Sequence, residues 1–151
     1  MVVDAQPWLK SKQVWSIRLT LQREGRIRDL ALFDLAIDSK LRGCDFVQLR
    51  IGQLVINAAA WHRATIVQQK TGKPVQFELT QQTRESLIAW LAHRGDGLQD
   101  FVFPSRMDVA GHISTRQYAR LVDDWVDSIE LGRSAYGTHS LRRTKVALIY
   151  K

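Results

Sequence analysis

The amino-acid sequence predicts a mainly α-helical protein with one small antiparallel β-hairpin. Two observations lead to this prediction: apolar residues recur at helical spacing along most of the chain, and residues 65–79 contain two strand-like segments around a turn. The length of 151 residues favours a single domain. Hydrophobic residues make up 45% of the chain and include five tryptophans, which supplies enough apolar surface for a core and argues against disorder.

Helices are predicted for most of the first fifty residues. The first is expected from a cap at Ser11 to about Glu24, where Gly25 favours a stop. The second covers residues 29–40, because apolar side chains fall on one stripe there. A third is expected to begin near Cys44 and to continue through the apolar residues that follow.

The middle of the chain predicts the β-hairpin. Residues 65–69 are expected to form one strand, residues 70–73 a turn, and residues 74–79 the returning strand, which alternates polar and apolar side chains. Gly72 can take the positive φ that such a turn requires. The hairpin would therefore carry Lys70 and Lys73 at its tip.

The second half of the chain is predicted to be helical, with a short extended segment at residues 100–103. The first of these helices is expected to begin at a threonine whose side-chain oxygen caps a free backbone amide. Their expected bounds are Thr80 or Thr83 to about Gly95, Ser114-Thr115 to about Leu131, and a start around His139 or Ser140. Their Trp and Leu stripes are expected to form core rather than a surface on which bases stack.

The charge of the chain favours a polyanionic partner. Lys and Arg total 22 against 15 Asp and Glu, a net charge of +7. No acidic residue lies between Asp45 and Glu78 or after Glu130, so one face would be strongly positive if these two stretches meet in the fold. Such a face would bind phosphates, less tightly as salt rises, although a basic surplus also serves simple solubility.

Several classes of protein are disfavoured. The single cysteine, Cys44, excludes an internal disulfide framework and any multi-cysteine metal site. The four histidines lie far apart, so we expect no metal site and no cofactor. We find no apolar run of membrane-spanning length and no signal peptide, and we therefore expect a cytoplasmic, nucleoid-associated location without membrane contact.

Three segments together resemble the tyrosine recombinases, the phage integrase family. Residues 41–49, LRGCDFVQL, resemble the first arginine motif of that family. The turn KTGK is similar to its hairpin with the active-site lysine, and YGTHSLRRT at residues 136–144 resembles its His-x-x-Arg box. The order of the segments also matches, and the likeness extends from about residue 20 to the end. It implies the recombinase catalytic-domain fold and double-stranded DNA as the partner.

The resemblance assigns the phosphate clamp to two arginines. Phosphodiester transfer without a metal must neutralise the non-bridging oxygens in the transition state, and guanidinium groups stay charged and donate hydrogen bonds in a fork. By resemblance, Arg42 and Arg142 take this role. His139 would donate a further hydrogen bond to the phosphate or help to move a proton.

The remaining roles also come from the resemblance. Lys70 would be the general acid that protonates the departing 5′-oxygen, with Lys73 as the competing candidate at the same turn. Asp45 would orient neighbouring groups. Lys73 and Arg143 would contact the DNA backbone.

The sequence departs from the family pattern at the nucleophile. The family uses a tyrosine well after the His-x-x-Arg box, whereas this chain stops at Lys151, 151 − 142 = 9 residues after Arg142. Tyr118 and Tyr136 precede the box, and Tyr150 lies too close to it. We therefore expect a piece truncated before the nucleophile, which binds DNA without cleaving it by the family's route.

Three functional hypotheses follow. The main one is a single catalytic-type domain over residues 1–151 that serves site-specific recombination or integration. Residues 1–20 would be a lead-in, with no separate DNA-clamping domain before them. The second is a non-catalytic DNA-binding protein or regulator that kept the fold. The third is a protein-interaction module, and self-association, as in a recombinase tetramer on DNA, is compatible with the first and the third. None of them involves a small-molecule substrate.

Overall fold

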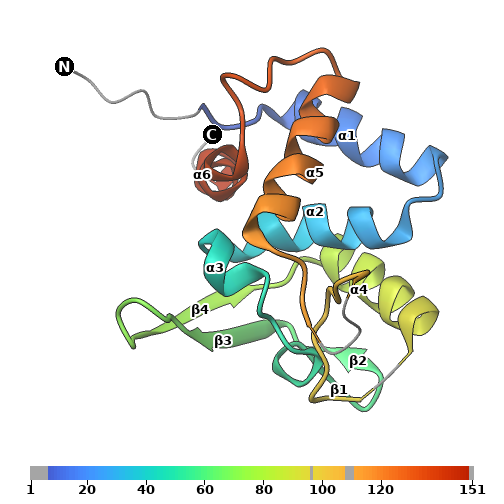
Figure 1. Cartoon of the computed structure of the whole chain (residues 1–151), viewed down its shortest axis with the longest axis vertical. Coiled ribbons are helices and arrows are strands. Elements are labelled where there is room, and N and C mark those ends of the chain that lie inside the picture. The colour runs from blue at the N-terminus through green and yellow to red at the C-terminus, as the bar shows by residue number, and fades with distance from the viewer. Residues whose placement is uncertain (1–6, 96, 108–110, 150–151) are drawn as a thin grey trace.

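The computed structural model describes residues 7–95, 97–107 and 111–149, with side chains up to residue 144 (Figure 1). The described part is mainly helical and contains two small antiparallel sheets, which confirms the predicted fold class. The helices are α1 Ser11–Arg23, α2 Ile27–Ser39, α3 Gly43–Phe46, the 3-10 turn η1 Ile51–Gln53, α4 Gln81–Arg94, α5 Thr115–Ser128 and α6 Thr138–Ile149. The strands are β1 Val55–Ile56, β2 Ala59–Ala60, β3 Arg63–Val67 and β4 Pro74–Glu78.

Helix α2 runs through the centre of the molecule. Helices α1, α4 and α6 all pack against it, and nearly all of its side chains are buried. Burial on every side explains why three aspartates of α2 are buried as well, since each must find a partner inside the protein. Asp34 accepts hydrogen bonds from Arg18 of α1 at 2.6 and 2.9 Å and from the hydroxyl of Ser86 on α4 at 2.8 Å. These contacts hold α1 and α4 on opposite sides of α2.

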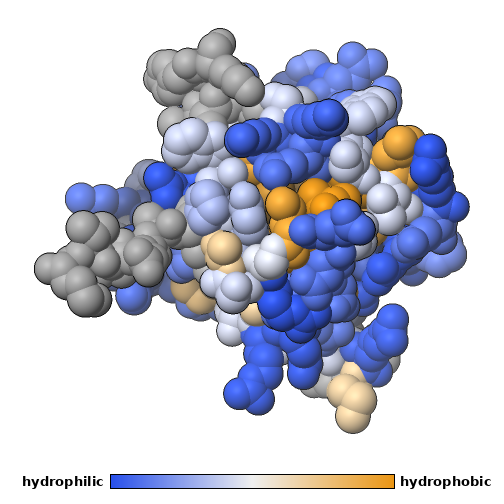
Figure 2. All heavy atoms as spheres, turned by 90° about the horizontal axis from the view of Figure 1, so that it is seen from above, coloured by the Kyte–Doolittle hydropathy of each residue, from blue (hydrophilic) through white to orange (hydrophobic). Residues whose placement is uncertain are grey.

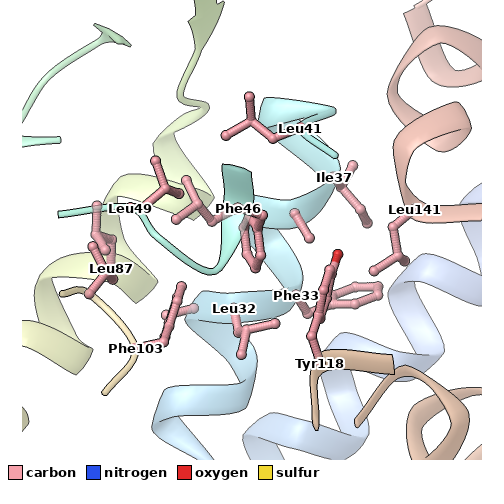
Figure 3. Packing of buried hydrophobic residues seen from close by; sticks show 14 of the residues in the cluster. Leu32, Phe33, Ile37, Leu41, Phe46, Leu49, Leu87, Phe103, Tyr118 and Leu141 are labelled. Atoms are coloured by element: carbon pink, nitrogen blue, oxygen red, sulfur yellow. The ribbon is translucent and has the colours of Figure 1, made fainter. Parts of the chain in front are cut away.

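Aromatic rings fill the core between α2, α3 and α5. Phe33 meets Trp125 edge to face with ring centroids 5.4 Å apart, and Phe46 lies 4.9 Å from Tyr118 and 5.7 Å from Phe103. Figure 3 shows Phe33, Phe46 and Tyr118 grouped beside α2. Such offset and edge-to-face pairs add about 0.5–1.5 kcal/mol each beyond the area they bury. The packing places the start of α3 and the start of α5 next to each other.

The predicted hairpin is present, with its first strand two residues earlier than expected. Strand β3 pairs with β4 from Arg63↔Glu78 to Val67↔Pro74, so residues 68 and 69 belong to the turn. Ala64 and Ile66 face the core while their neighbours in β3 are exposed. This alternation is the burial expected of a strand with one covered face.

A second hairpin was not predicted. Strands β1 and β2 pair through a two-residue turn in which Asn57 and Ala58 have φ of 50° and 64°. Two-residue strands are too short to show a period, and alanine is not a residue that signals a left-handed turn. The extended segment expected at residues 100–103 forms one isolated bridge, between Phe101 and Arg50.

Several predicted helix ends are corrected. Ser11 is the first helical residue rather than the cap, because the side chain of Gln13 accepts the amide hydrogen of Lys10 at 2.8 Å. Thr80, not Thr83, caps α4 and accepts the Thr83 amide hydrogen at 3.4 Å. The third predicted helix is a single turn, and α5 ends three residues before the expected end at residue 131.

The stripes of tryptophan and leucine mostly form core, as expected. Trp90 and Trp125 are buried, and the indole of Trp90 donates to the carbonyl of Val102 at 2.8 Å. Trp8 and Trp15 are about half exposed. Figure 2, which views the molecule from above, shows a mostly hydrophilic face with a small hydrophobic group near its centre and another toward its right-hand edge.

Candidate functional site

The first arginine motif begins where α2 ends. Lys40 follows the helix in a left-handed conformation, Leu41 is buried, and Arg42 becomes the N-cap of α3. The carbonyl of Arg42 accepts the amide hydrogen of Phe46 at 2.9 Å. Because Leu41 and Phe46 are anchored in the core, the half-buried side chain of Arg42 starts from a fixed backbone.

Arg142 lies on α6, directly beside this motif. Its Nε donates a hydrogen bond to the backbone carbonyl of Lys40 at 3.1 Å, although the two residues are 102 positions apart. Lys40 precedes Arg42 by two residues, which span at most about 7 Å of chain. The structure therefore brings the His-x-x-Arg box against the backbone of the first arginine motif. Figure 1 shows α3 and α6 together at the C-terminal end of α2.

Contacts of α6 with the rest of the protein hold Arg142 in place. Leu141 and Thr144 are buried, and the hydroxyl of Thr144 accepts the amide hydrogen of Leu9 at 2.9 Å. The hydroxyl of Ser140, also buried, accepts the amide hydrogen of Gly137 at 3.1 Å. The helix is thus fixed at its first turns, where the candidate residues lie.

His139 and Arg143 are exposed on the same helix. His139 lies in the first turn, three residues before Arg142, and residues three apart on a helix are neighbours on one face. The guanidinium of Arg143 lies over the ring of Trp8, 5.6 Å from its centroid. Arg143 is therefore placed by a contact with the N-terminal segment as well as by its helix.

Asp45 joins the hairpin to the arginine motif. Its buried carboxylate accepts the amide hydrogen of Gln69 at 3.0 Å, and the side chain of Gln69 donates to the Oε1 of Gln48 at 3.0 Å. Lys70 is the next residue and is exposed in the turn. Asp45, three positions after Arg42, thus anchors the base of the turn that carries Lys70.

The turn itself is built by backbone and short side chains. The backbone amide of Gln68 donates to the carbonyl of Lys73 at 3.0 Å, and the amide of Gly72 donates to the carbonyl of Gln68 at 2.9 Å. Gly72 has φ of 67°, in the left-handed region. The hydroxyl of Thr71 accepts the Lys73 amide hydrogen at 3.1 Å. Lys70 and Lys73 both remain exposed. The geometry does not separate the two as candidates for the general acid.

Tyr118 lies in the core beneath this site. Burial raises the pKa of its phenol above the ordinary value, and the positive charge of Arg142 acts in the opposite direction. A Cβ at Gly43 would lie 3.7 Å from Thr115 and 3.9 Å from the Tyr118 ring, which is ordinary contact between α3 and α5. Tyr118 therefore belongs to the core beneath the site, and its hydroxyl is not accessible.

The two acid-free stretches meet only in part. Helix α6, which carries Arg142, and the β3–β4 hairpin, which carries the two lysines, lie on either side of α3 (Figure 1). Two other cations of these stretches are paired locally, since Arg63 bonds Glu78 across the hairpin at 3.0 Å and Arg133 bonds Asp127 of α5. The basic surface is therefore smaller than the sequence suggested.

The family model of the phage integrases matches residues 7–150 of this chain. The chain belongs to the phage integrase family. This confirms the family predicted from the three segments. No curated protein sequence matches the chain.

Solved structures resemble the integrase-family chain throughout its length. XerA recombinase has a TM-score of 0.76 with 16% identity, covering 95% of this chain and 50% of its own. XerH recombinase bound to difH substrate in a pre-cleavage complex has a TM-score of 0.72 with 17% identity, covering 99% and 45%. A lambda integrase dimer bound to a COC′ core site has a TM-score of 0.68 with 16% identity, covering 100% and 43%. This chain thus spans about half the length of these relatives and shares their fold.

The described residues contain no cluster of metal-binding side chains and no membrane-spanning helix. Among them, no three His, Cys, Asp or Glu side chains gather in a way that would hold a metal ion. None of the described helices is both long and apolar enough to cross a membrane. Tyr150, weighed above as a nucleophile, lies outside the described residues.

Sequence reasoning missed two features of this integrase site. The carbonyl of Lys40 binds Arg142, and Gln48 with Gln69 ties the hairpin to α3. Neither has a sequence signal, because a backbone carbonyl is present at every residue and glutamine is a common surface residue. The burial of Tyr118, in contrast, is expected from the sequence, because helical spacing places it on the apolar face of α5.

Proposed function

We propose that this integrase-family domain binds duplex DNA and clamps the scissile phosphate with Arg42 and Arg142 for strand transfer in site-specific recombination. The observation that carries the proposal is the hydrogen bond from Arg142 to the carbonyl of Lys40, two residues before Arg42. Two permanently charged forks near one another suit the two non-bridging oxygens of a phosphodiester. Their charge opposes the negative charge that builds during transfer.

The reaction needs a proton for its leaving group. Attack of a hydroxyl on phosphorus forms one P–O bond, releases the hydroxyl proton to water, and breaks the bond to the 5′-oxygen, which must then be protonated. In the proposal Lys70 supplies this proton, with Lys73 as the alternative, and the hydrogen bond from the Gln69 amide to Asp45 anchors the turn that carries both lysines. His139 donates a further hydrogen bond to the phosphate from the exposed first turn of α6.

DNA as the partner is supported by charge and by relatives. The chain carries a net charge of +7, and the XerH and lambda integrase structures contain a difH substrate and a COC′ core site. In the proposal Lys73 and Arg143 contact the DNA backbone, which positions the duplex without reading its sequence. The lambda integrase structure is a dimer on DNA, and we propose that this domain likewise assembles on its site.

Binding to a short duplex at several salt concentrations tests the clamp. We expect Arg42→Ala and Arg142→Ala each to weaken binding and to reduce the slope of log K against log salt by about 0.9, the value of one phosphate contact. Arg23→Ala at the exposed end of α1 is the matched control and should change neither quantity. Arginine variants indistinguishable from this control would contradict the proposal.

A nicked duplex that traps covalent intermediates separates strand transfer from binding alone. A covalent adduct formed by the unmodified chain and lost in Arg142→Ala supports strand transfer and overturns the expectation that the nucleophile is missing. Salt-dependent binding that needs both arginines but yields no adduct supports the alternative, a non-catalytic DNA-binding protein or regulator that kept the fold.

A further inference from the structure

Lys40 has an unusual backbone for its residue type. It closes α2 with φ of 54° and ψ of 24°, the left-handed region, which side chains larger than hydrogen disfavour. It is one of four described non-glycine residues with positive φ. Two of the others, Asn57 and Ala58, form the tight β1–β2 turn. Lys40 lies instead beside the candidate site.

The left-handed conformation turns the backbone N–H and C=O of Lys40 toward different partners. The amide of Lys40 still donates to the Ala36 carbonyl of α2 at 3.3 Å. Its carbonyl leaves the direction of the helix axis and accepts Nε of Arg142 at 3.1 Å. Had Lys40 kept helical angles, its carbonyl would point along α2 with the other carbonyls. The turn therefore creates the acceptor that Arg142 uses.

We propose that the left-handed turn at Lys40 is the positioning element that holds Arg142 ready for the phosphate, an inference that rests on the proposed function above. The Lys40 carbonyl accepts the hydrogen of Arg142 Nε, so the two terminal nitrogens of the guanidinium remain to donate to two phosphate oxygens. It also fixes the plane of the guanidinium before DNA arrives. Lysine has a single nitrogen and cannot bind the carbonyl while presenting a fork.

The same turn sets the position of Arg42. Only Leu41 separates the two residues, and its side chain is 3% exposed and anchored in the core. Its amide donates to the hydroxyl of Ser39 at 3.3 Å, which restricts the connection further. One short segment thus controls both candidate arginines, one through its backbone path and one through a carbonyl.

Two substitutions at this position distinguish the backbone from the side chain. Lys40→Asn and Lys40→Val both remove the positive charge, but asparagine tolerates the left-handed region and a β-branched valine does not. We expect Lys40→Asn to behave almost like the unmodified chain. We expect Lys40→Val to weaken duplex binding about tenfold, as Arg142→Ala does, because a charge-assisted contact is lost. In an Arg142→Ala background, Lys40→Val should weaken binding much less than it does in the unmodified chain, because only its effect on the position of Arg42 remains.

Hydrogen exchange at Nε of Arg142, followed by NMR, tests the positioning without DNA. We expect slow exchange in the unmodified chain and in Lys40→Asn, and fast exchange in Lys40→Val. Fast exchange in the unmodified chain would overturn the inference even if the valine variant does not fold. So would equal exchange and equal binding in the folded valine and asparagine variants. If exchange follows the expected order while Arg142→Ala leaves DNA binding unchanged, the positioning is supported and the proposed function fails.

Discussion

The bond between Asp45 and the hairpin makes a sharp prediction for Asp45→Ala. Asp45 is 5% exposed, and its carboxylate accepts the Gln69 amide hydrogen at 3.0 Å across 24 residues of chain. A hydrogen bond to a charged group contributes about 1.5–3 kcal/mol to stability. Its loss here removes the contact that anchors the base of the hairpin turn. We therefore expect the free energy of unfolding to fall by about 2 kcal/mol. We also expect amide exchange at Gln69 to become at least tenfold faster.

Urea unfolding and amide hydrogen exchange measure these two effects. Asp45→Asn keeps an oxygen that can accept the same hydrogen and should retain most of the protection. Asp100→Ala is the matched control, because it removes a similar carboxylate–amide bond, to Gly97 at 2.8 Å, on an exposed loop. It should leave Gln69 unchanged. Unaltered exchange at Gln69 in Asp45→Ala would refute the reasoning, since the hairpin would then not depend on this carboxylate.

Two further predictions concern the core. Asp34→Ala leaves Arg18 buried without its partner, and we expect the free energy of unfolding, measured in urea, to fall by about 3–5 kcal/mol. The double variant Arg18→Met with Asp34→Leu should lose much less, and an equal loss would contradict this explanation. The phenol of Tyr118 has a pKa raised by burial, so its neutral form favours the folded state. Below about pH 10, the unfolded pKa of tyrosine, this contribution is fully present. It decreases as the pH rises from there, by at most about 1.4 kcal/mol per pH unit. Between pH 9 and pH 11 the free energy of unfolding, measured in urea, should fall less for Tyr118→Phe than for the unmodified chain. An equal fall in the two proteins would contradict the assignment.

The sequence alone was sufficient for the helices and the main hairpin. Their apolar spacing and the turn around Gly72 depend on neighbouring residues, which is the range over which periodicity and turn chemistry act. The β1–β2 hairpin was not predicted, because its strands have two residues each and Ala58 occupies a left-handed position. The pairing of Arg133 with α5 also escaped, although Asp123 and Asp127 lie one helical turn apart and face the same side.

The sequence by itself determined the family and the residue types of the candidate site. Three short segments in order indicated arginines, a hairpin lysine and a histidine, and the family match confirmed the kinship. Only the tertiary structure decided how these segments meet. Arg142 reaches the carbonyl of Lys40 across 102 residues, and Asp45 reaches the Gln69 amide across 24. Both contacts use a backbone group of the kind that nearly every residue carries, so the sequence does not indicate which residue provides it. They exist only because packing around α2 brings distant backbones together.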